Sequence, residues 1–265
     1  MTTSLYVGDL HAKPDLLPLI SAAADRHHAD RIILLGDICD DWNLSNNMQT
    51  AWVEWFTDWY RHETLEREII PLLGNHDIPY WLGVGSTFDM LNSSVGFPGY
   101  KPGAKRRVHE LIHMLPFRLV WSDGYSIATH AGLTWDWLIA NIPNAGKLTP
   151  VQIAEQLNGH MNAHRLASLY YDIGPARGGD SRTPSLLWAD RSELVADNDY
   201  CLTQIVGHTP VPSVTRELGN LWFCDTFSTD SNGKPIGDQT MLLVTDAKPT
   251  PSFDIIPLYQ NDDKE

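Results

Sequence analysis

The sequence predicts an α/β protein of the α+β type, in which two packed mixed β-sheets are flanked by helices as a four-layer α-β-β-α sandwich. In the first part of the chain apolar strand-like runs alternate with helical patterns, and the last part is rich in strands. A hydrophobic fraction of 43% over 265 residues is enough for one large core. No repeat, low-complexity tract or linker divides the chain, so we expect a single domain over residues 1–265.

The first part of the chain alternates between strands and helices. In chain order we expect a strand over 4–11, a helix over 14–27, a strand over 31–37, a helix over 50–68 and a strand over 69–77. The second helix is amphipathic, with Trp52, Trp55, Phe56, Trp59 and Tyr60 at helical spacing. This period favours packing in the core over a platform for an aromatic ligand.

The second part contains shorter apolar runs. Residues 117–132 predict two strands that turn at Asp123-Gly124, and further strands are expected over 204–211, 220–228 and 240–246. Two segments, about 78–115 and 134–187, do not fit this rhythm and are expected to be cap-like insertions, the first Gly-rich and then helical, the second mostly helical and polar. Loops at strand ends commonly build substrate pockets, and surface packing is the alternative for both.

Charge and cysteine content limit the possible partners and compartment. A formal charge of −14 and a pI of about 5.1 argue against a nucleic-acid partner, because a phosphate backbone repels such a chain. We see no signal peptide, and no apolar stretch approaches the roughly 18 residues of a membrane-spanning helix, so no membrane partner is expected. Cys39, Cys201 and Cys224 form no C-x-x-C pattern, which favours a reducing, cytoplasmic location.

Potential metal ligands follow five of the predicted strands. They are Gly8-Asp9-Leu10-His11, Gly36-Asp37 with Asp40 close behind, Gly74-Asn75-His76-Asp77, Thr129-His130-Ala131-Gly132 and Gly207-His208-Thr209-Pro210. Each pattern alone is a weak signal that could be only a turn. Five in succession, each after an apolar run, make chance a poor explanation.

These residue types suit a particular chemistry. Apolar strands fix the backbone at one sheet edge, and glycines let it approach closely in the turns. Carboxylates, an amide oxygen and imidazoles suit a divalent metal, and a bridging carboxylate suits two metals roughly 3.5 to 4 Å apart. The positive charge of the metals would then stabilise aspartates at the ends of buried strands.

The order of these motifs resembles the calcineurin-like metallophosphoesterase superfamily, which shows D-x-H, G-D-x-x-D, G-N-H-[DE], H-x-G and G-H in that order. The match runs from residue 5 to about residue 228. "THAGL", "GHTP" and "SLLWADR" are nearest the phosphoprotein phosphatase and diadenosine tetraphosphatase branch. The fold of this superfamily agrees with the one expected from the strand pattern.

The resemblance implies a role for each matching residue. The first metal would be bound by Asp9 and His11, Asp37 would bridge both metals, and Asn75, His130 and His208 would bind the second. The metal ions would be Mn, Fe or Zn, and a hydroxide between them would attack phosphorus. His76 would protonate the leaving oxygen as general acid, and Asp40 would orient its ring.

The sequence departs from the branch at the expected phosphate contacts. Asp41 stands where the branch has arginine, so one phosphate-binding cation is missing. Arg191 is a candidate substrate-binding residue, Arg177 and Arg182 are rivals for this role, and each could instead be a solvated surface charge. Asp225 could support a metal-binding histidine from behind or could belong to a simple turn.

We therefore expect a dinuclear metal-dependent phosphoesterase. Its substrate would be a phosphorylated small molecule, a nucleotide or nucleoside polyphosphate, or a phosphoprotein. Asp77, where protein phosphatases commonly have glutamate, moves weight away from the phosphoprotein. The alternatives are a serine/threonine-type protein phosphatase, a phosphodiesterase, which the missing arginine would suit, and a non-catalytic metal- or nucleotide-binding module on the same fold.

Overall fold

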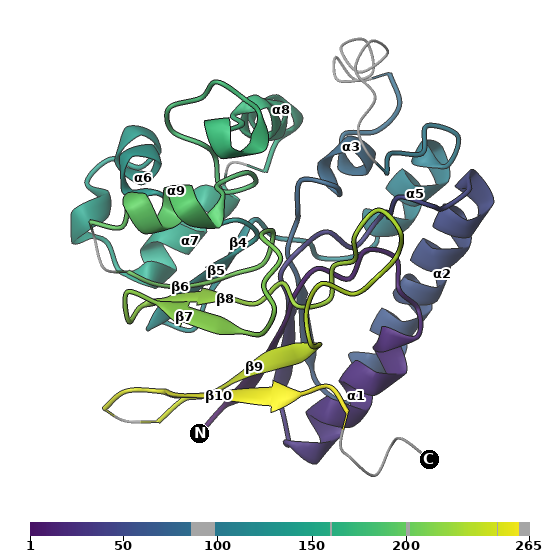
Figure 1. The fold of residues 1–265 in the computed structure, drawn as a ribbon, viewed down its shortest axis with the longest axis horizontal. Helices are drawn as coiled ribbons and strands as arrows, with labels where there is room; N and C mark the ends of the chain where they lie inside the picture. The colour runs from purple at the N-terminus through teal and green to yellow at the C-terminus, as the bar shows by residue number, and fades with distance from the viewer. Residues whose placement is uncertain (86–98, 160, 200–201, 248, 260–265) are drawn as a thin grey trace.

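Two five-stranded β-sheets pack face to face in the structure, a computed structural model that describes residues 1–85, 99–159, 161–199, 202–247 and 249–259 (Figure 1). Helices α1 and α2 lie on the outer side of one sheet, and α6, α7 and α9 lie outside the other (Figure 1). The predicted four-layer arrangement is confirmed. Residues 86–98 of the first predicted insertion, and Cys201, lie outside the described residues.

The first sheet has the strand order β10-β9-β1-β2-β3. Its members are β1 (Thr3–Val7), β2 (Arg31–Leu34), β3 (Glu68–Pro71), β9 (Thr240–Thr245) and β10 (Ser252–Pro257). Strands β1, β2 and β3 are parallel and in register, with Val7 opposite Leu34 and Leu34 opposite Pro71. Their carboxyl ends therefore reach the same edge of the sheet.

The second sheet has the order β4-β5-β6-β8-β7. Its members are β4 (Val120–Ser122), β5 (Ser126–Thr129), β6 (Thr203–Val206), β7 (Thr215–Glu217) and β8 (Leu221–Phe223). The three central strands β5, β6 and β8 are parallel, and β4 and β7 close the two edges antiparallel. Asp123 forms the predicted hairpin turn, because its Oδ1 accepts hydrogen bonds from the N–H groups of Tyr125 and Ser126.

A short backbone connection joins the two sheets next to the carboxyl end of β3. Arg118, just before β4, pairs parallel with Leu72, just after β3. The Arg118 N–H donates to the Pro71 carbonyl at 3.0 Å, and the Leu73 N–H donates to the Arg118 carbonyl at 2.8 Å. The chain therefore fixes the ends of β3 and the start of β4 relative to each other.

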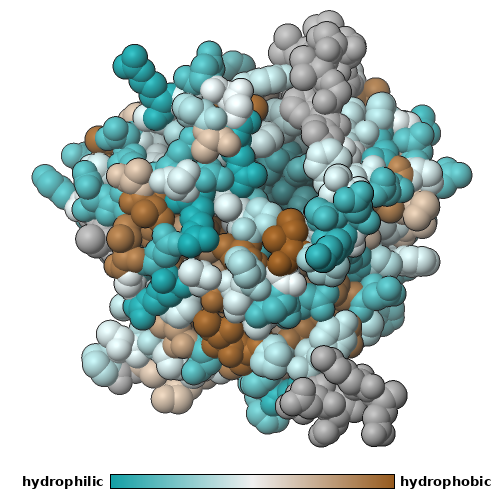
Figure 2. Space-filling view, viewed as in Figure 1, coloured by the Kyte–Doolittle hydropathy of each residue, from teal (hydrophilic) through white to brown (hydrophobic). Residues whose placement is uncertain are grey.

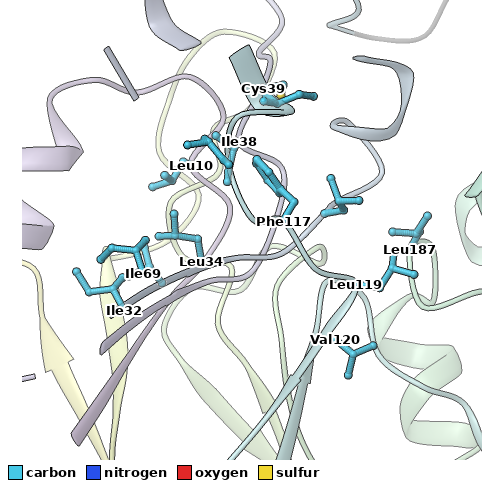
Figure 3. Close-up of a cluster of buried hydrophobic side chains, with 14 of the residues drawn as sticks. Leu10, Ile32, Leu34, Ile38, Cys39, Ile69, Phe117, Leu119, Val120 and Leu187 are labelled. Carbon is cyan, nitrogen blue, oxygen red and sulfur yellow. The ribbon is translucent and has the colours of Figure 1, made fainter. Parts of the chain in front are cut away.

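The core follows the alternation of side chains along the strands. Tyr6, Ile33 and Leu35 point toward the other sheet, whereas Leu5 and Leu34 point toward the helices. The helix-facing cluster continues past the strand ends, and Figure 3 shows Leu10, Ile38 and Cys39 of the following loops within it. The turns that carry the polar motifs are thus anchored by buried apolar neighbours. Cys39 and Cys224 are both buried free thiols.

Helices α1 (Leu16–Arg26) and α2 (Asn46–Glu63) cover the first sheet. Ser45 caps α2 by accepting a hydrogen bond from the Met48 N–H. Trp52 and Phe56 of the aromatic stripe are buried, which confirms the packing interpretation for them. Trp55 is 58% exposed and points away from the core.

The two predicted insertions contribute helices around the polar edge. They carry α3 (Ile78–Trp81), α5 (Lys105–Ile112), α6 (Trp135–Asn141), α7 (Pro150–Asn158) and α8 (Ala163–Tyr171), with 3-10 turns at Ala145–Lys147 and Pro175–Arg177. Helix α3 of the first segment contacts α8 of the second, so the two meet above the strand ends (Figure 1).

The face of the molecule in Figure 2 is mainly hydrophilic with scattered hydrophobic residues. None of the described helices is long and apolar enough to cross a membrane.

Three short elements are absent from the sequence expectations: β7, β10 and α9 (Arg191–Ala196). The two strands lie at sheet edges, where one side faces solvent and the apolar signal is weak. Helix α9 has six residues and is held by a capping box between Asp190 and Glu193 rather than by a long apolar stripe.

Candidate metal centre

The polar motifs come together around Asp37, at the edge where the parallel strands of both sheets end. His130 Nε2 lies 3.4 Å from Asp37 Oδ2, and His11 Nε2 lies 3.8 Å from the same oxygen. Asp37 and His130 are almost fully buried, and His11 is partly exposed. The carboxylate of Asp37 is therefore positioned between two groups of ligating side chains.

The first group consists of Asp9, His11 and Asp37. All three follow strands of the first sheet, and His11 Nε2 is 4.0 Å from Asp9 Oδ2. The other ring nitrogen of His11 lies 3.0 Å from the carbonyl oxygen of Asp40, which orients the imidazole toward the carboxylates. Two carboxylates and one imidazole suit a divalent metal.

The second group consists of Asp37, His130 and His208, with Asn75 beside them. Asn75 Oδ1 is 2.7 Å from His130 Nε2 and 3.1 Å from His208 Nδ1, and the two ring nitrogens are 3.1 Å apart. Asn75 and Asp37 follow strands of the first sheet, whereas the histidines follow β5 and β6 of the second. This group forms only where the two sheets meet.

The donor atoms of the second group fit a cation. His130 Nδ1 lies 2.8 Å from the Leu35 carbonyl oxygen and donates a hydrogen bond to it, which directs Nε2 toward Asn75 Oδ1. Burial by itself would lower the pKa of His130, but the Asp37 carboxylate raises it. A divalent ion at this point would replace the proton that otherwise separates these acceptors.

A bound cation would also stabilise the buried carboxylates of the site. Burial raises the pKa of Asp9 well above its usual range, and the carboxylates of Asp225 and Asp37 raise it further. Burial alone would raise the pKa of Asp37 too, but His130 and His76 hold it well below its usual range. Burial lowers the pKa of His208 far below its usual value, so this imidazole stays neutral. An ionised bridging carboxylate and a neutral imidazole are the states that bind metals.

Close backbone packing explains two of the glycines. A Cβ on Gly74 would overlap the Asp37 carboxylate, and a Cβ on Gly207 would overlap the Asp9 carboxylate. Asp37 and His208 themselves have left-handed backbone angles, with φ of 49° and 63°. Such conformations are rare outside glycine and persist where the surroundings enforce them, as they often do at functional sites.

His76 stands beside the two groups and is held by Asp40. His76 Nδ1 is 2.7 Å from Asp40 Oδ1, and the Tyr80 hydroxyl donates to Asp40 Oδ2 at 3.1 Å. Burial would lower the pKa of His76, but Asp37 and Asp40 outweigh it and raise the pKa to about 10. His76 also lines the cavity above the cluster. Tyr80 is a member of this network that sequence reasoning missed.

Asp77 has a structural role that its motif position did not reveal. Its Oδ1 accepts hydrogen bonds from the N–H groups of Ile38 and Cys39, and its Oδ2 accepts one from Gly74 N–H. The buried carboxylate thus ties the loop after β2 to the loop after β3. This link fixes Asp37 relative to the residues that follow β3.

Asp225 follows β8, the third parallel strand of the second sheet, and is fully buried. Its oxygens accept from the N–H and hydroxyl of Ser228 at 3.2 and 2.8 Å. Its charge raises the pKa of Asp9 and acts on His11, so it lies behind the first group. The Ser228 contacts agree with a turn residue, and support of a metal-binding histidine stays a prediction.

A polar cavity of about 210 Å³ opens above the cluster. Asp41 lines it, and Lys13 Nζ lies 3.6 Å from Asp41 Oδ2. Arg177 is the only arginine or lysine among the described residues that line this cavity. Its guanidinium contacts Thr209 Oγ1 at 2.8 Å, the His208 carbonyl at 3.3 Å and Asp190 at 3.0 Å. These contacts hold a positive charge at the cavity wall.

Arg191, the sequence candidate for substrate binding, lies elsewhere. Its guanidinium pairs with Glu217 and lies 5.4 Å from the ring centroid of Phe223, and Arg191 is not among the cavity-lining residues. Arg182 is exposed. Of the three arginines weighed from sequence, Arg177 is the one that lines the cavity.

A second cavity of about 130 Å³ adjoins the first, and four aromatic rings and a proline line it together with Asp40, Asn75 and His76. Its walls include Trp42, Pro79, Tyr100, Tyr170 and Trp188. The indole N–H of Trp188 donates to the Tyr170 carbonyl at 2.7 Å, and the two rings meet edge to face at 5.6 Å. Sequence reasoning did not find this cavity, because its residues come from loops and insertions without a shared motif.

Comparison with known proteins agrees with this cluster. A family model described as calcineurin-like phosphoesterase matches residues 3–230. Among solved structures, the crystal structure of TT1561 of Thermus thermophilus aligns with 11% identity and a TM-score of 0.42, covering 97% of this chain and 99% of that chain. A likeness at that level carries no weight for fold or function. No curated protein matches the sequence.

Proposed function

Because the chain belongs to the calcineurin-like phosphoesterase family, we propose that it hydrolyses phosphate esters at a site for two divalent metal ions. The observation that carries the proposal is the position of Asp37. This single carboxylate belongs both to the group with Asp9 and His11 and to the group with His130 and His208. A shared carboxylate can hold two metal ions at the short separation that two-metal catalysis uses.

Arg177, His76 and Asp40 each have a chemical task in this proposal. When bound, the metals lower the pKa of water and neutralise charge on the phosphate. Arg177 holds a positive charge at the cavity wall for the phosphoryl oxygens. His76 donates a proton to the leaving oxygen, and Asp40 keeps its ring in the orientation that this transfer needs.

Metal analysis and a substrate panel test the proposal. The purified protein is loaded with Mn²⁺, Fe²⁺ or Zn²⁺, and its metal content is measured by mass spectrometry. The panel holds an aryl phosphate, an aryl phosphodiester, a phosphopeptide and diadenosine tetraphosphate. We expect two metals per chain and hydrolysis that a chelator abolishes. Two bound metals without hydrolysis of any member would instead favour a non-catalytic binding module.

A phosphodiesterase is the second candidate, and Asp41 is the observation that favours it. This carboxylate lines the polar cavity and would repel a dianionic monoester more than a monoanionic diester. Lys13 offsets part of that charge. If this repulsion acts on the substrate, Asp41→Asn raises the monoester-to-diester ratio of kcat/KM by roughly fivefold. An unchanged ratio would remove the argument for the diester.

A further inference from the structure

We propose that the aromatic cavity binds the leaving group of the substrate, and that this group is a planar aromatic ring. The inference rests on the proposed phosphoesterase function and names the class of ester that the site takes. Trp42, Tyr100, Tyr170, Trp188 and Pro79 line the cavity. Its other lining residues are Asp40, Asn75 and His76. Aromatic walls bind flat rings by stacking and edge contacts.

The two cavities share the residue that would protonate the leaving group. His76, Asn75, Trp42 and Trp188 line both the polar cavity and the aromatic one. A phosphate over the metal ligands would therefore place its ester oxygen near His76, with the rest of the alcohol directed toward the aromatic walls. His76 lies at the boundary that a general acid must occupy.

Three rings of this cavity, those of Trp188, Tyr100 and Tyr170, are held in place before any ligand binds. Trp188 is fixed by its hydrogen bond to the Tyr170 carbonyl and by an edge contact with His208 at 5.8 Å. Tyr100 packs against Tyr80 with ring centroids 5.4 Å apart. Tyr170 is buried, whereas Trp42 is 50% exposed. A preformed wall costs little ordering on binding.

The volume limits the ligand to one ring system. The cavity encloses about 130 Å³. A dry apolar cavity of about 150 Å³ in another protein holds benzene. A phenyl ring or one nucleobase therefore fits, and an aryl ester and a nucleoside ester are the two sources of the same planar chemistry.

Binding of non-hydrolysable phosphonates tests the inference without depending on turnover. Benzylphosphonate, adenosine 5′-phosphonate and propylphosphonate are titrated by calorimetry against the Mn²⁺-loaded protein, its Trp42→Ala variant and Trp55→Ala as a control. Trp55 is similarly exposed on α2 but lines neither cavity. We expect an aromatic phosphonate to bind at least about fivefold more tightly than propylphosphonate, which is the low end of a stacking contact. Trp42→Ala should reduce that ratio toward one, and Trp55→Ala should not.

Each outcome decides a separate point. A wild-type ratio near one, or the same ratio in wild type and Trp42→Ala, would overturn the inference and leave the proposed function standing. If neither the aromatic nor the aliphatic phosphonate binds, the failure lies at the metal site. The affinities of benzyl alcohol and adenosine are then compared with that of 1-propanol, which gives the aromatic-to-aliphatic ratio without the phosphate. Tyr100→Leu tests another residue of the wall should Trp42→Ala fail to fold. The better aromatic ligand distinguishes an aryl from a nucleoside source.

Discussion

The metal cluster and the aromatic cavity adjoin at His76, yet the chain builds them in opposite ways. Every metal-ligand candidate lies within a few residues of the carboxyl end of a parallel strand. The aromatic residues come instead from the loop before α2, from both insertions and from the segment before α9. Parallel strands fix the positions of the residues that follow them, whereas loops vary more in sequence and conformation.

Because the two regions are built from different segments, substitutions can change metal chemistry and substrate selectivity independently. A substitution at a strand end alters a residue that Asp77, Gly74 and the buried core hold in one place. A substitution at Trp42 in the aromatic wall leaves the Asp77 and Gly74 contacts untouched. We therefore expect metal binding and turnover to depend on the first region, and preference among esters to depend on the second.

The largest effect should come from Asp37→Asn. Each metal supplies several kcal/mol of stabilisation to the transition state, and Asp37 belongs to both groups, so kcat should fall roughly ten-thousandfold or more. Metal content measured by mass spectrometry should fall with it. Asp58→Asn, an exposed carboxylate on α2, is the control. Full metal content and activity in Asp37→Asn would refute the shared-ligand assignment.

His76→Asn should give the next largest effect, and it separates acid catalysis from metal binding. Loss of a general acid costs about a hundredfold to a thousandfold in kcat. The metal content should stay that of the wild type, because His76 is directed at Asp40 rather than at the ligand atoms of the second group. Steady-state kinetics on an aryl phosphate, with metal analysis on the same sample, provide the check. A loss of metal would make His76 a ligand instead.

Metal removal should lower thermal stability by a moderate amount. A ligand at 100 times its dissociation constant stabilises the folded state by about 2.7 kcal/mol, which is roughly 5 to 11 °C in Tm for a domain of this size. The repulsion between the buried carboxylates of Asp9 and Asp225 returns when the ions leave. Scanning calorimetry with and without chelator measures the shift. An unchanged Tm would indicate that no ion occupies the cluster in solution.

Tyr80→Phe should give the smallest effect and tests how far the insertions support the acid. The Tyr80 hydroxyl donates to Asp40 Oδ2 and accepts from the Lys101 N–H. The substitution removes both hydrogen bonds, and loss of the one to Asp40 costs about 1 kcal/mol, or roughly fivefold in kcat. Tyr60→Phe, on α2 and among the lining residues of neither cavity, is the matched control. Equal kcat in both variants would show that Asp40 needs no help from α3.

The metal cluster was predictable from sequence because its signal is local. An apolar run, a glycine and a ligand such as Asp37 or His208 lie within a few positions, and parallel strands must bring such ends together. The choice between Arg177 and Arg191 was not predictable. It depends on where Asp190, Glu217 and the His208 carbonyl come to lie, and those contacts join segments far apart in the chain.

The aromatic cavity was hidden for a related reason. Tyr100 and Tyr170 are 70 positions apart in sequence and have no common spacing with Trp42. Aromatic residues are common in cores, so composition does not distinguish a wall from packing. The short strands β7 and β10 were not predicted from sequence, because edge strands of this length show little hydrophobic periodicity. Sequence patterns therefore locate the chemistry more readily than the specificity.

The pairing of β1 with β9 has a consequence for synthesis of the chain. Thr3 pairs with Thr245, so the ribosome must complete more than 240 residues before one edge of β1 finds its partner. Until then β1 exposes unpaired backbone groups beside strands that have already formed, and open edges of this kind recruit other chains. Strands β9 and β10 contribute none of the ligand candidates. A nascent chain cut before residue 240 would therefore hold every ligand and yet be prone to aggregate.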